Sequence, residues 1–133
     1  MDQLRDIMIK KTITIESDRT AQDAAKLMAE YSIGSLVILE NDRPVGIVTE
    51  RDLVRKVCAK DVTSSNVPLR DILSSPVIWA EPDTPIETAV QRMFNSKIRR
   101  LPIVEHGKLV GIVTVSDLAK HLRTKSLIDK IFD

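Results

Sequence analysis

Gly46-Ile47-Val48-Thr49-Glu50-Arg51-Asp52-Leu53 returns later in the same chain as Gly111-Ile112-Val113-Thr114-Val115-Ser116-Asp117-Leu118. The two copies lie 65 residues apart, and this offset holds without a gap from residues 4–53 to residues 69–118. About 20 of the 54 positions from 4 to 57 match their partner residue. Because a unit this short cannot close a large core alone, the repeat predicts two similar units that pack about a pseudo-two-fold axis.

The composition indicates one compact body with no large excess of charge. The chain has 133 residues, of which 43% are hydrophobic and 29% are charged, which is enough for one core built from two halves. Its formal net charge is only +1, so charge gives no basis for holding a nucleic acid or an acidic membrane. No signal pattern opens the chain, and no apolar run approaches the roughly 20 residues of a membrane span. We expect a cytoplasmic protein with no nucleic-acid or membrane partner.

Cysteine and aromatic residues are scarce. Cys58 is the only cysteine, which excludes an internal disulfide and a multi-cysteine metal site, and we expect it to be a buried small apolar side chain. The aromatic residues are Tyr31, Trp79, Phe94 and Phe132, too few for a stacking platform for single-stranded nucleic acid.

Each copy predicts the same series of elements, β-α-β-β-α, and therefore an α+β fold. Residues 12–15 and 77–80 are rich in β-formers and predict the first strand of each copy. A helix follows, announced in the second copy by Thr84 as N-cap and Pro85 at the first helical position. Two strands joined by a tight turn come next, and a second helix starts at Thr49 in one copy and at Thr114 in the other.

The repeat also predicts how the chain is divided. We expect a first unit over residues 1–60, a linker over 61–68, a second unit over 69–123 and a helical tail over 124–133. The linker is polar and has no periodicity. The tail carries one apolar stripe that needs a surface to pack on, formed by Leu127, Ile128, Ile131 and Phe132.

The repeated motif has two interpretations. A threonine at the end of a strand, followed three residues later by an aspartate, is typical of a capping box that begins a helix. The same residues suit a nucleotide: a glycine lets a ligand approach the strand, helix-start amides suit phosphate, and a carboxylate accepts two hydrogen bonds from a ribose diol. The motif alone leaves both interpretations open.

The repeat, the linker and the motif together resemble the tandem cystathionine β-synthase (CBS) domain pair. The resemblance extends from about Leu4 to His121. The family's phrase is a glycine, two apolar residues, Thr or Ser, any residue, Ser or Thr, and Asp. Residues 111–117 match it fully, whereas the first copy has Arg51 in place of the second hydroxyl.

The resemblance implies a regulatory module that binds AMP, ADP, ATP or S-adenosylmethionine in the cleft between two CBS units. It nominates Thr114, Ser116 and Asp117 for one site, and Thr49 and Asp52 for the other. In this family, residues of the first and second strands enclose the adenine. The corresponding residues here are Thr12, Ile13, Ile33, Gly34, Ser35, Val77, Ile78, Ile98 and Pro102.

Arg99 and Arg100 precede the second strand of the second copy, where nucleotide-binding members of the family often carry basic residues for the phosphates. The forked donors of arginine suit phosphate, but the pair could equally be a solvated surface pair. Alternation along a strand would send only one of them toward the cleft. The first copy has Gly34 and Ser35 at these positions, so the two sites should differ.

The remaining candidate residues point away from catalysis. Trp79 could line an adenine pocket or fill the seam between the copies. His106 and His121 lack companion ligands at metal spacing, so we expect neither a metal site nor a cofactor. No nucleophile, base or metal set stands out, and we expect no enzyme activity. The resemblance and the apolar tail predict a homodimer, and the competing hypothesis is a ligand-free dimerising scaffold.

Overall fold

The computed structural model describes residues 2–10, 12–74 and 78–132, and for residues 124–132 it describes the backbone only. The chain divides into two compact units. One unit comprises residues 13–77, and the other combines residues 1–12 with residues 78–133. No helix within the described residues has both the length and the apolar character needed to cross a bilayer.

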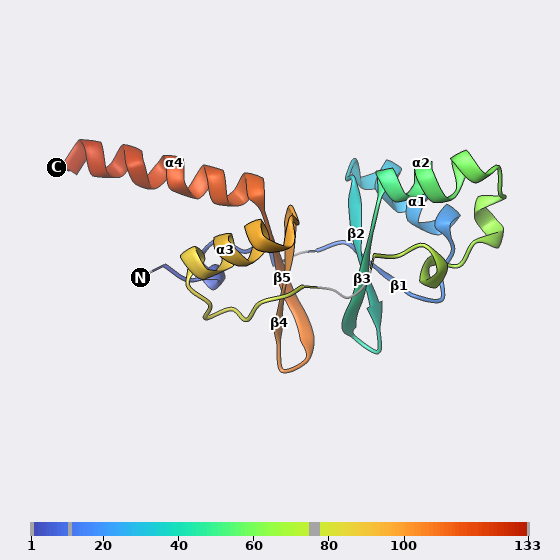
Figure 1. Ribbon diagram of the computed structural model, residues 1–133. Helices are drawn as coiled ribbons and strands as arrows, with labels where there is room; N and C mark the ends of the chain where they lie inside the picture. The colour runs from blue at the N-terminus through green and yellow to red at the C-terminus, as the bar shows by residue number, and fades with distance from the viewer. Residues whose placement is uncertain (1, 11, 75–77, 133) are drawn as a thin grey trace. The chain divides into compact units, whose positions relative to one another are not determined.

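The unit of residues 13–77 contains a three-stranded sheet and two α-helices (Figure 1). Strand β2 is central; it pairs in parallel with β1 and antiparallel with β3. The elements follow one another in the predicted order: β1 (Thr14–Glu16), α1 (Ala21–Tyr31), β2 (Ser35–Glu40), β3 (Arg43–Thr49) and α2 (Glu50–Lys56).

Alternation along the strands creates the core of this unit. Leu36, Ile38 and Val48 lie in one core cluster with α1 residues such as Ala24 and Met28, because every second side chain of a strand points to the same face. Helix α1 begins with a capping box in which Thr20 N donates to Asp23 Oδ2 at 3.1 Å. This hydrogen bond lowers the pKa of the Asp23 carboxyl.

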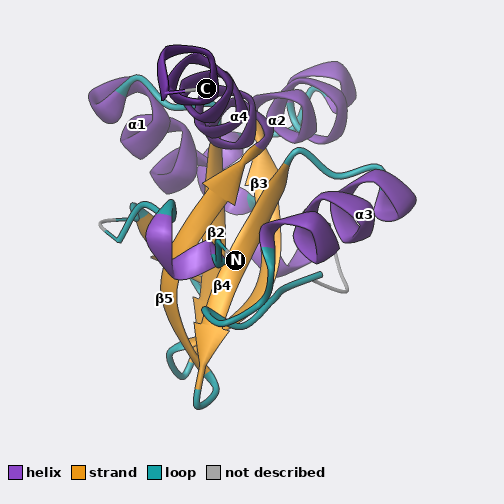
Figure 2. Ribbon diagram, turned by 90° about the vertical axis from the view of Figure 1, so that its left-hand side faces the viewer, coloured by secondary structure: helices purple, strands orange, loops and turns teal. Residues whose placement is uncertain are grey.

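The second unit repeats this order with a shorter sheet (Figures 1 and 2). Its elements are α3 (Ile86–Ser96), β4 (Arg100–Glu105), β5 (Lys108–Thr114) and α4 (Val115–Phe132). Strands β4 and β5 form an antiparallel hairpin, whose turn lies at the opposite end from the start of α4. The α+β class with two similar units is therefore confirmed.

The first strand predicted for the second copy is reduced to a single pairing. Val77 lies outside the described residues, and Ala80 forms an isolated parallel bridge with Ile103. Ala80 N donates to Pro102 O at 3.1 Å, and Val104 N donates to Ala80 O at 2.8 Å. The next bond of this ladder would need an N–H from Pro102, which proline lacks. The first copy has Val37 at that position and forms a three-residue β1.

Two details of the sequence prediction were wrong, the N-cap of α3 and the burial of Cys58. Helix α3 begins at Ile86 with Pro85 as N-cap and no side-chain cap, so Thr84 is not the cap. Residues 124–132 are helical, as expected of the tail, and they continue α4 without a break; the side chains of their apolar stripe lie outside the described part. Cys58 is exposed, because the neighbouring Val57 takes the buried position where α2 ends.

The two repeats exchange their leading segments. In η1 (Leu4–Asp6), Leu4 N donates to Thr84 O at 3.0 Å, and in η4 (Leu69–Asp71), Leu69 N donates to Arg19 O at 2.9 Å. Likewise, isolated antiparallel bridges join Ile9 to Ile112 and Ser74 to Ile47. Each compact unit therefore takes its leading segment from the other repeat. The unit of residues 13–77 is still continuous along the chain, whereas the other unit combines residues 1–12 with residues 78–133.

The polar segment between the repeats is ordered against the first helix. Ala21 N donates to Val67 O at 2.8 Å, and Val67 packs against the core cluster of residues 13–77. A short turn, η3 (Ser64–Asn66), precedes this contact. The segment expected as a linker thus also contributes Val67 to the packing around this core.

Candidate functional site

The repeated motif forms a capping box where β3 meets α2. Thr49 N donates to Asp52 Oδ2 at 2.9 Å, and Asp52 N donates to Thr49 Oγ1 at 3.2 Å. Each side chain thereby satisfies a backbone donor that the first turn of a helix leaves unpaired. The capping interpretation of the motif is therefore confirmed for this copy.

The second copy forms the same capping box where β5 meets α4. Thr114 N donates to Asp117 Oδ2 at 2.9 Å, and Asp117 N donates to Thr114 Oγ1 at 3.1 Å. One carboxylate oxygen is sufficient for this role. Capping therefore does not exclude a ligand, because Oδ1 is not used by the cap.

The two aspartates differ in what their second oxygen contacts. Asp52 Oδ1 lies 3.2 Å from Lys56 Nζ, and the same ammonium donates to Ile72 O at 2.9 Å. The residue that corresponds to Lys56 in the second copy is His121, whose Nε2 lies 3.1 Å from Asp2 Oδ2. Among the described residues, no side chain pairs with Asp117 Oδ1. Asp117 Oδ1 can therefore accept a further hydrogen bond, whereas Asp52 Oδ1 is already paired with Lys56.

The glycines of the motif serve chain packing. A Cβ atom on Gly46 would lie 2.7 Å from Leu73 Cδ1, and one on Gly111 would lie 2.9 Å from Met8 Sδ and 3.1 Å from Ile9 O. Protein atoms of the exchanged segments thus fill the space beside both glycines. Close packing of the exchanged segments is thus one physical reason for glycine at both positions, and the interpretation that these glycines admit a ligand to the strand stays a prediction.

The arginines and the motif of the second copy meet at one end of the β4–β5 hairpin. Arg100 pairs with Thr114 in the register of the hairpin, and Val115 N donates to Arg99 O at 3.0 Å. Ser116 is exposed and Asp117 is half-buried beside them. The five polar residues that the sequence nominated in this copy therefore lie at the same end of the hairpin.

The two arginines lie on different faces. Arg99 lines a groove between α3 and α4, whereas Leu101 and Ile103 belong to the core cluster beneath these helices. Alternation along β4 places Arg100 and Pro102 on the opposite face of the strand from Leu101. Pro102 is buried and Arg100 is half-buried. Arg100 is thus the arginine that shares a sheet face with Thr114, its register partner.

The corresponding end of the other unit has no arginine at the start of its second strand; Arg51 lies instead in the first turn of α2. Ser35 pairs with Thr49 in the β2–β3 register, and Glu50 N donates to Gly34 O at 3.0 Å. Glu50 Oε1 would lie 3.2 Å from a Cβ atom on Gly34. This end therefore carries a carboxylate where the second unit carries Val115.

The remaining nominated residues are half-buried. Ile13 and Ile33 pack against the core cluster of residues 13–77, and Ile78 and Ile98 pack against the core cluster of the other unit. Thr12 ends the leading segment that belongs to that other unit. These side chains contribute to packing whether or not a ligand is bound.

Comparison with known proteins identifies the family. The model of the CBS domain matches residues 4–59 and again residues 69–124. The chain belongs to the CBS domain family. An uncharacterized protein of Methanopyrus kandleri is 48% identical over 111 residues; the match covers 82% of this chain and only 57% of that protein's length.

Two solved structures share the arrangement of elements in this CBS domain pair. The CBS domain pair of protein MJ0100, in complex with 5′-methylthioadenosine and S-adenosyl-L-methionine, is 28% identical with a TM-score of 0.82, and the match covers 94% of this chain and 98% of that one. A hexameric CBS-CP12 protein from bloom-forming cyanobacteria is 31% identical with a TM-score of 0.78. The match covers 89% of this chain and 66% of that chain.

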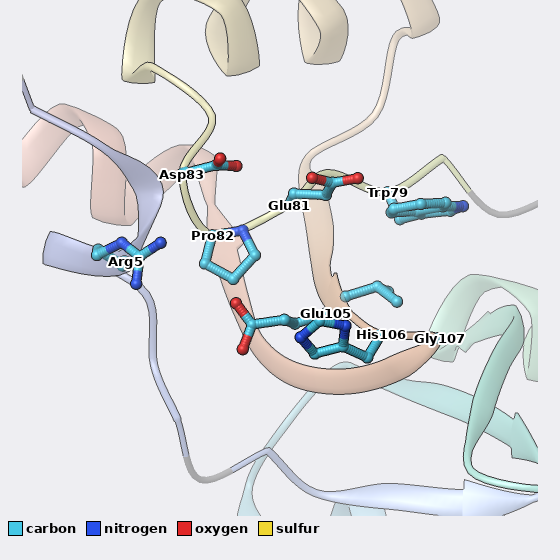
Figure 3. Close-up of a pocket in the computed structure, with 9 residues that line it drawn as sticks. Arg5, Trp79, Glu81, Pro82, Asp83, Glu105, His106 and Gly107 are labelled. Atoms are coloured by element: carbon cyan, nitrogen blue, oxygen red, sulfur yellow. The ribbon is translucent and has the colours of Figure 1, made fainter.

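The second CBS unit also has a pocket that sequence reasoning missed (Figure 3). Its volume is about 380 Å³, and of the residues considered from the sequence only Trp79 and His106 line it. Trp79, which lines this pocket, is 45% exposed, and Arg92 Nη1 donates to Trp79 O at 2.9 Å. The other lining residues come from the η1 segment, the approach to α3 and the hairpin turn: Arg5, Glu81, Pro82, Asp83, Val104, Glu105, His106 and Gly107. Within the described part of the chain no three carboxylate, histidine or cysteine side chains gather as metal ligands.

Proposed function

We propose that this CBS domain pair is a regulatory module that binds an adenine nucleotide through the carboxylate of Asp117. The observation that carries the proposal is the difference between the two aspartates. Asp117 uses Oδ2 for the helix cap, and no described side chain pairs with Oδ1. A carboxylate oxygen of this kind accepts strong, charge-assisted hydrogen bonds from the hydroxyls of a ribose.

Arg100 is the proposed phosphate ligand. Arg100 lies opposite Thr114 in the hairpin register, and Thr114 precedes Asp117 by about one turn of helix. Its guanidinium can donate two parallel hydrogen bonds to a phosphate. The start of α4, an 18-residue helix, adds the positive end of the helix dipole. The cation suits the phosphate of a nucleotide, and the carboxylate suits the hydroxyls of its ribose.

The first copy is proposed as the weaker site. Asp52 Oδ1 is paired with Lys56, and the residues corresponding to the arginines are Gly34 and Ser35. A ribose at Asp52 would have to compete with the ammonium of Lys56 for Oδ1, and a phosphate there would meet no arginine at the start of β2. One ligand per chain should therefore bind more tightly than a second.

The relatives support a ligand that contains adenosine, but they do not indicate whether that ligand carries phosphate groups. The complex of the MJ0100 domain pair contains two adenosine derivatives without phosphate groups. S-adenosylmethionine therefore stays the alternative, with the same ribose contact and no role for Arg100. We further propose a cytoplasmic homodimer that passes a ligand-induced change to a regulated partner. Binding between the two CBS units stays a prediction.

Titration calorimetry with AMP, ADP, ATP and S-adenosylmethionine tests the proposal. At a hundredfold excess over Kd, a ligand contributes about 2.7 kcal/mol, which raises the Tm of a chain of this size by roughly 8 °C. Binding with one tight site per chain is the expected result. No heat and no Tm shift with any of the four at millimolar concentration would overturn the proposal and favour the ligand-free scaffold.

A further inference from the structure

The segments around the pocket beside the hairpin turn of the second CBS unit are fixed by their backbone (Figure 3). Pro82 and Val104 are its buried lining residues, and Arg5 N donates to Pro82 O at 2.9 Å. His106 and Gly107 have φ angles of 53° and 78°, as the two central residues of a type I′ hairpin turn do. A hydrogen bond between distant segments and a tight turn therefore set the outline of the pocket.

Trp79 forms an aromatic wall of this pocket. Its side chain is exposed and lies outside the core cluster of its unit, while Arg92 of α3 holds its carbonyl oxygen. Figure 3 shows the indole ring nearly edge-on, so that one of its faces is turned across the pocket toward His106 and Gly107. The face of an indole ring is electronegative and attracts cations. This wall thus suits a positively charged ligand.

The charges around the pocket favour the same kind of ligand. Three carboxylates and the guanidinium of Arg5 leave its lining with a net charge of −2 when His106 is neutral. Arg5 Nε donates to Gln3 Oε1 at 3.0 Å. Among the described residues no ion pair includes any of the three carboxylates, which belong to Glu81, Asp83 and Glu105. The negative charge of the pocket is therefore not compensated within the chain, and it raises the local concentration of cations.

The first repeat has the same charges without the aromatic wall. The corresponding charged residues there are Glu16, Asp18, Glu40 and Arg70. Thr14 takes the place of Trp79, and Ser17 takes the place of Pro82. Ser17 Oγ donates to Glu40 Oε2 at 3.2 Å, a contact that a proline cannot make with Glu105. The charged residues are thus common to both repeats, whereas the aromatic wall and the unpaired Glu105 belong to the second repeat alone.

We propose that this pocket binds a guanidinium group, which stacks on Trp79 and donates from its edge to the carboxylates. A guanidinium is flat, stacks on aromatic faces and pairs with carboxylates through two parallel hydrogen bonds. An ammonium ion has no flat face to lie against the indole, and an anion would be repelled by the carboxylates. The volume of about 380 Å³ lies within the range of small-molecule sites, roughly 300–1,000 Å³.

The inference goes beyond the proposed function and does not depend on it. The pocket lies at the turn of the β4–β5 hairpin, whereas Asp117 lies at the other end, where α4 starts. A guanidinium group can come from a free small molecule or from an arginine side chain of a partner protein. Both sources have the same chemistry, and the choice of probes separates them.

Fluorescence titration of Trp79 tests the proposal, because Trp79 is the only tryptophan of the chain and its emission reports on the pocket directly. Butylguanidine should change this emission in a saturable manner. Butylurea, which has the same shape without the charge, should not, and butylammonium should bind more weakly. An acetylated Gly-Arg-Gly amide that binds at least about tenfold more tightly than butylguanidine assigns the site to an arginine of a protein segment. Equal or tighter binding of butylguanidine assigns it to a free small molecule.

Glu105→Gln and its counterpart Glu40→Gln form the matched pair of variants. Both side chains are exposed, so neither change should unfold the chain, and circular dichroism verifies this. Glu105→Gln should weaken butylguanidine binding at least about threefold, whereas Glu40→Gln should leave it unchanged. Trp79→Thr installs the residue of the first repeat and, measured by calorimetry, should weaken binding about fivefold.

Three results would overturn the proposal. The first is the absence of any change in emission and of any heat with butylguanidine at millimolar concentration. The second is equal binding of butylurea, which would show that charge has no role. The third is binding that both Glu105→Gln and Trp79→Thr leave unchanged, which would place the ligand elsewhere on the chain.

Discussion

Lys56 Nζ lies 3.2 Å from Asp52 Oδ1 and 2.9 Å from Ile72 O, so the ammonium holds the first motif aspartate against the exchanged segment. His121 replaces this lysine in the second repeat and contacts Asp2 instead. One substitution between the repeats thus changes which aspartate retains an acceptor. The following predictions depend on this difference and on the exchange.

Asp117→Asn should separate capping from ligand binding. Asparagine can still cap the helix, so the free energy of unfolding without ligand should fall by at most about 1 kcal/mol. The loss of the charged acceptor should weaken AMP or ATP binding at least tenfold, since hydrogen bonds to charged groups contribute roughly 1.5–3 kcal/mol. Calorimetry and thermal melts measure both quantities. A large fall in Tm with unchanged affinity would mean that Asp117 is only a cap.

Asp52→Asn is the matched control for the first repeat. Because Asp52 Oδ1 is already paired with Lys56, the tight binding event should keep its affinity within about twofold. Only a second, weaker event should be lost. Equal losses of affinity in the Asp52 and Asp117 variants would show that the two sites are equivalent, contrary to the proposal.

Arg100→Gln should distinguish phosphate from other adenosine ligands. Removing the guanidinium should weaken ATP and AMP binding about tenfold or more, because a charge-assisted contact is lost. Adenosine and S-adenosylmethionine should bind with little change. Arg99→Gln serves as the control, since Arg99 lines the α3–α4 groove instead. The assignment fails if Arg99→Gln, and not Arg100→Gln, removes the preference for phosphates.

Gly111→Ala should destabilise the chain without any ligand present. The added methyl would lie 2.9 Å from Met8 Sδ and 3.1 Å from Ile9 O, and relieving such overpacking costs about 1–3 kcal/mol. Gly34→Ala should cost less, because its nearest neighbour is the end of the exposed Glu50 side chain at 3.2 Å. Urea denaturation gives both values. Equal stability of the two variants would speak against close packing of the leading segment on β5.

Leu4→Ala tests the exchange of leading segments directly. Leu4 is fully buried in the core cluster that contains Leu101 and Val113, and truncating such a side chain costs about 2–5 kcal/mol. Hydrogen exchange followed by mass spectrometry should therefore show faster exchange in β4 and β5 than in β2 and β3. Leu69→Ala should have the opposite effect. Faster exchange of β2 and β3 in the Leu4 variant would mean that each repeat folds on its own leading segment.

The sequence alone determined the repeat, the β-α-β-β-α order and the capping boxes. These are local properties: the 65-residue offset is visible in the chain, strand and helix periods follow from alternating and helical spacing, and a capping box spans only four residues. The interruption of the ladder beside the Ala80–Ile103 bridge could also be predicted from the sequence, because Pro102 cannot donate a backbone hydrogen bond.

The tertiary structure decided what no local pattern contains. Similar leading segments, residues 4–7 and 69–72, could have packed on either repeat, and only long-range contacts such as Leu4 with Thr84 select the exchange. The role of Gly111 follows from the same contacts. Which arginine shares a face with Thr114 depends on the register of the β4–β5 hairpin, so sequence spacing could nominate the two arginines but could not rank them. The pairing of Asp52 with Lys56, by contrast, is a contact between residues four apart on one helix; the further contact of Lys56 with Ile72 is long-range, and only the tertiary structure shows it.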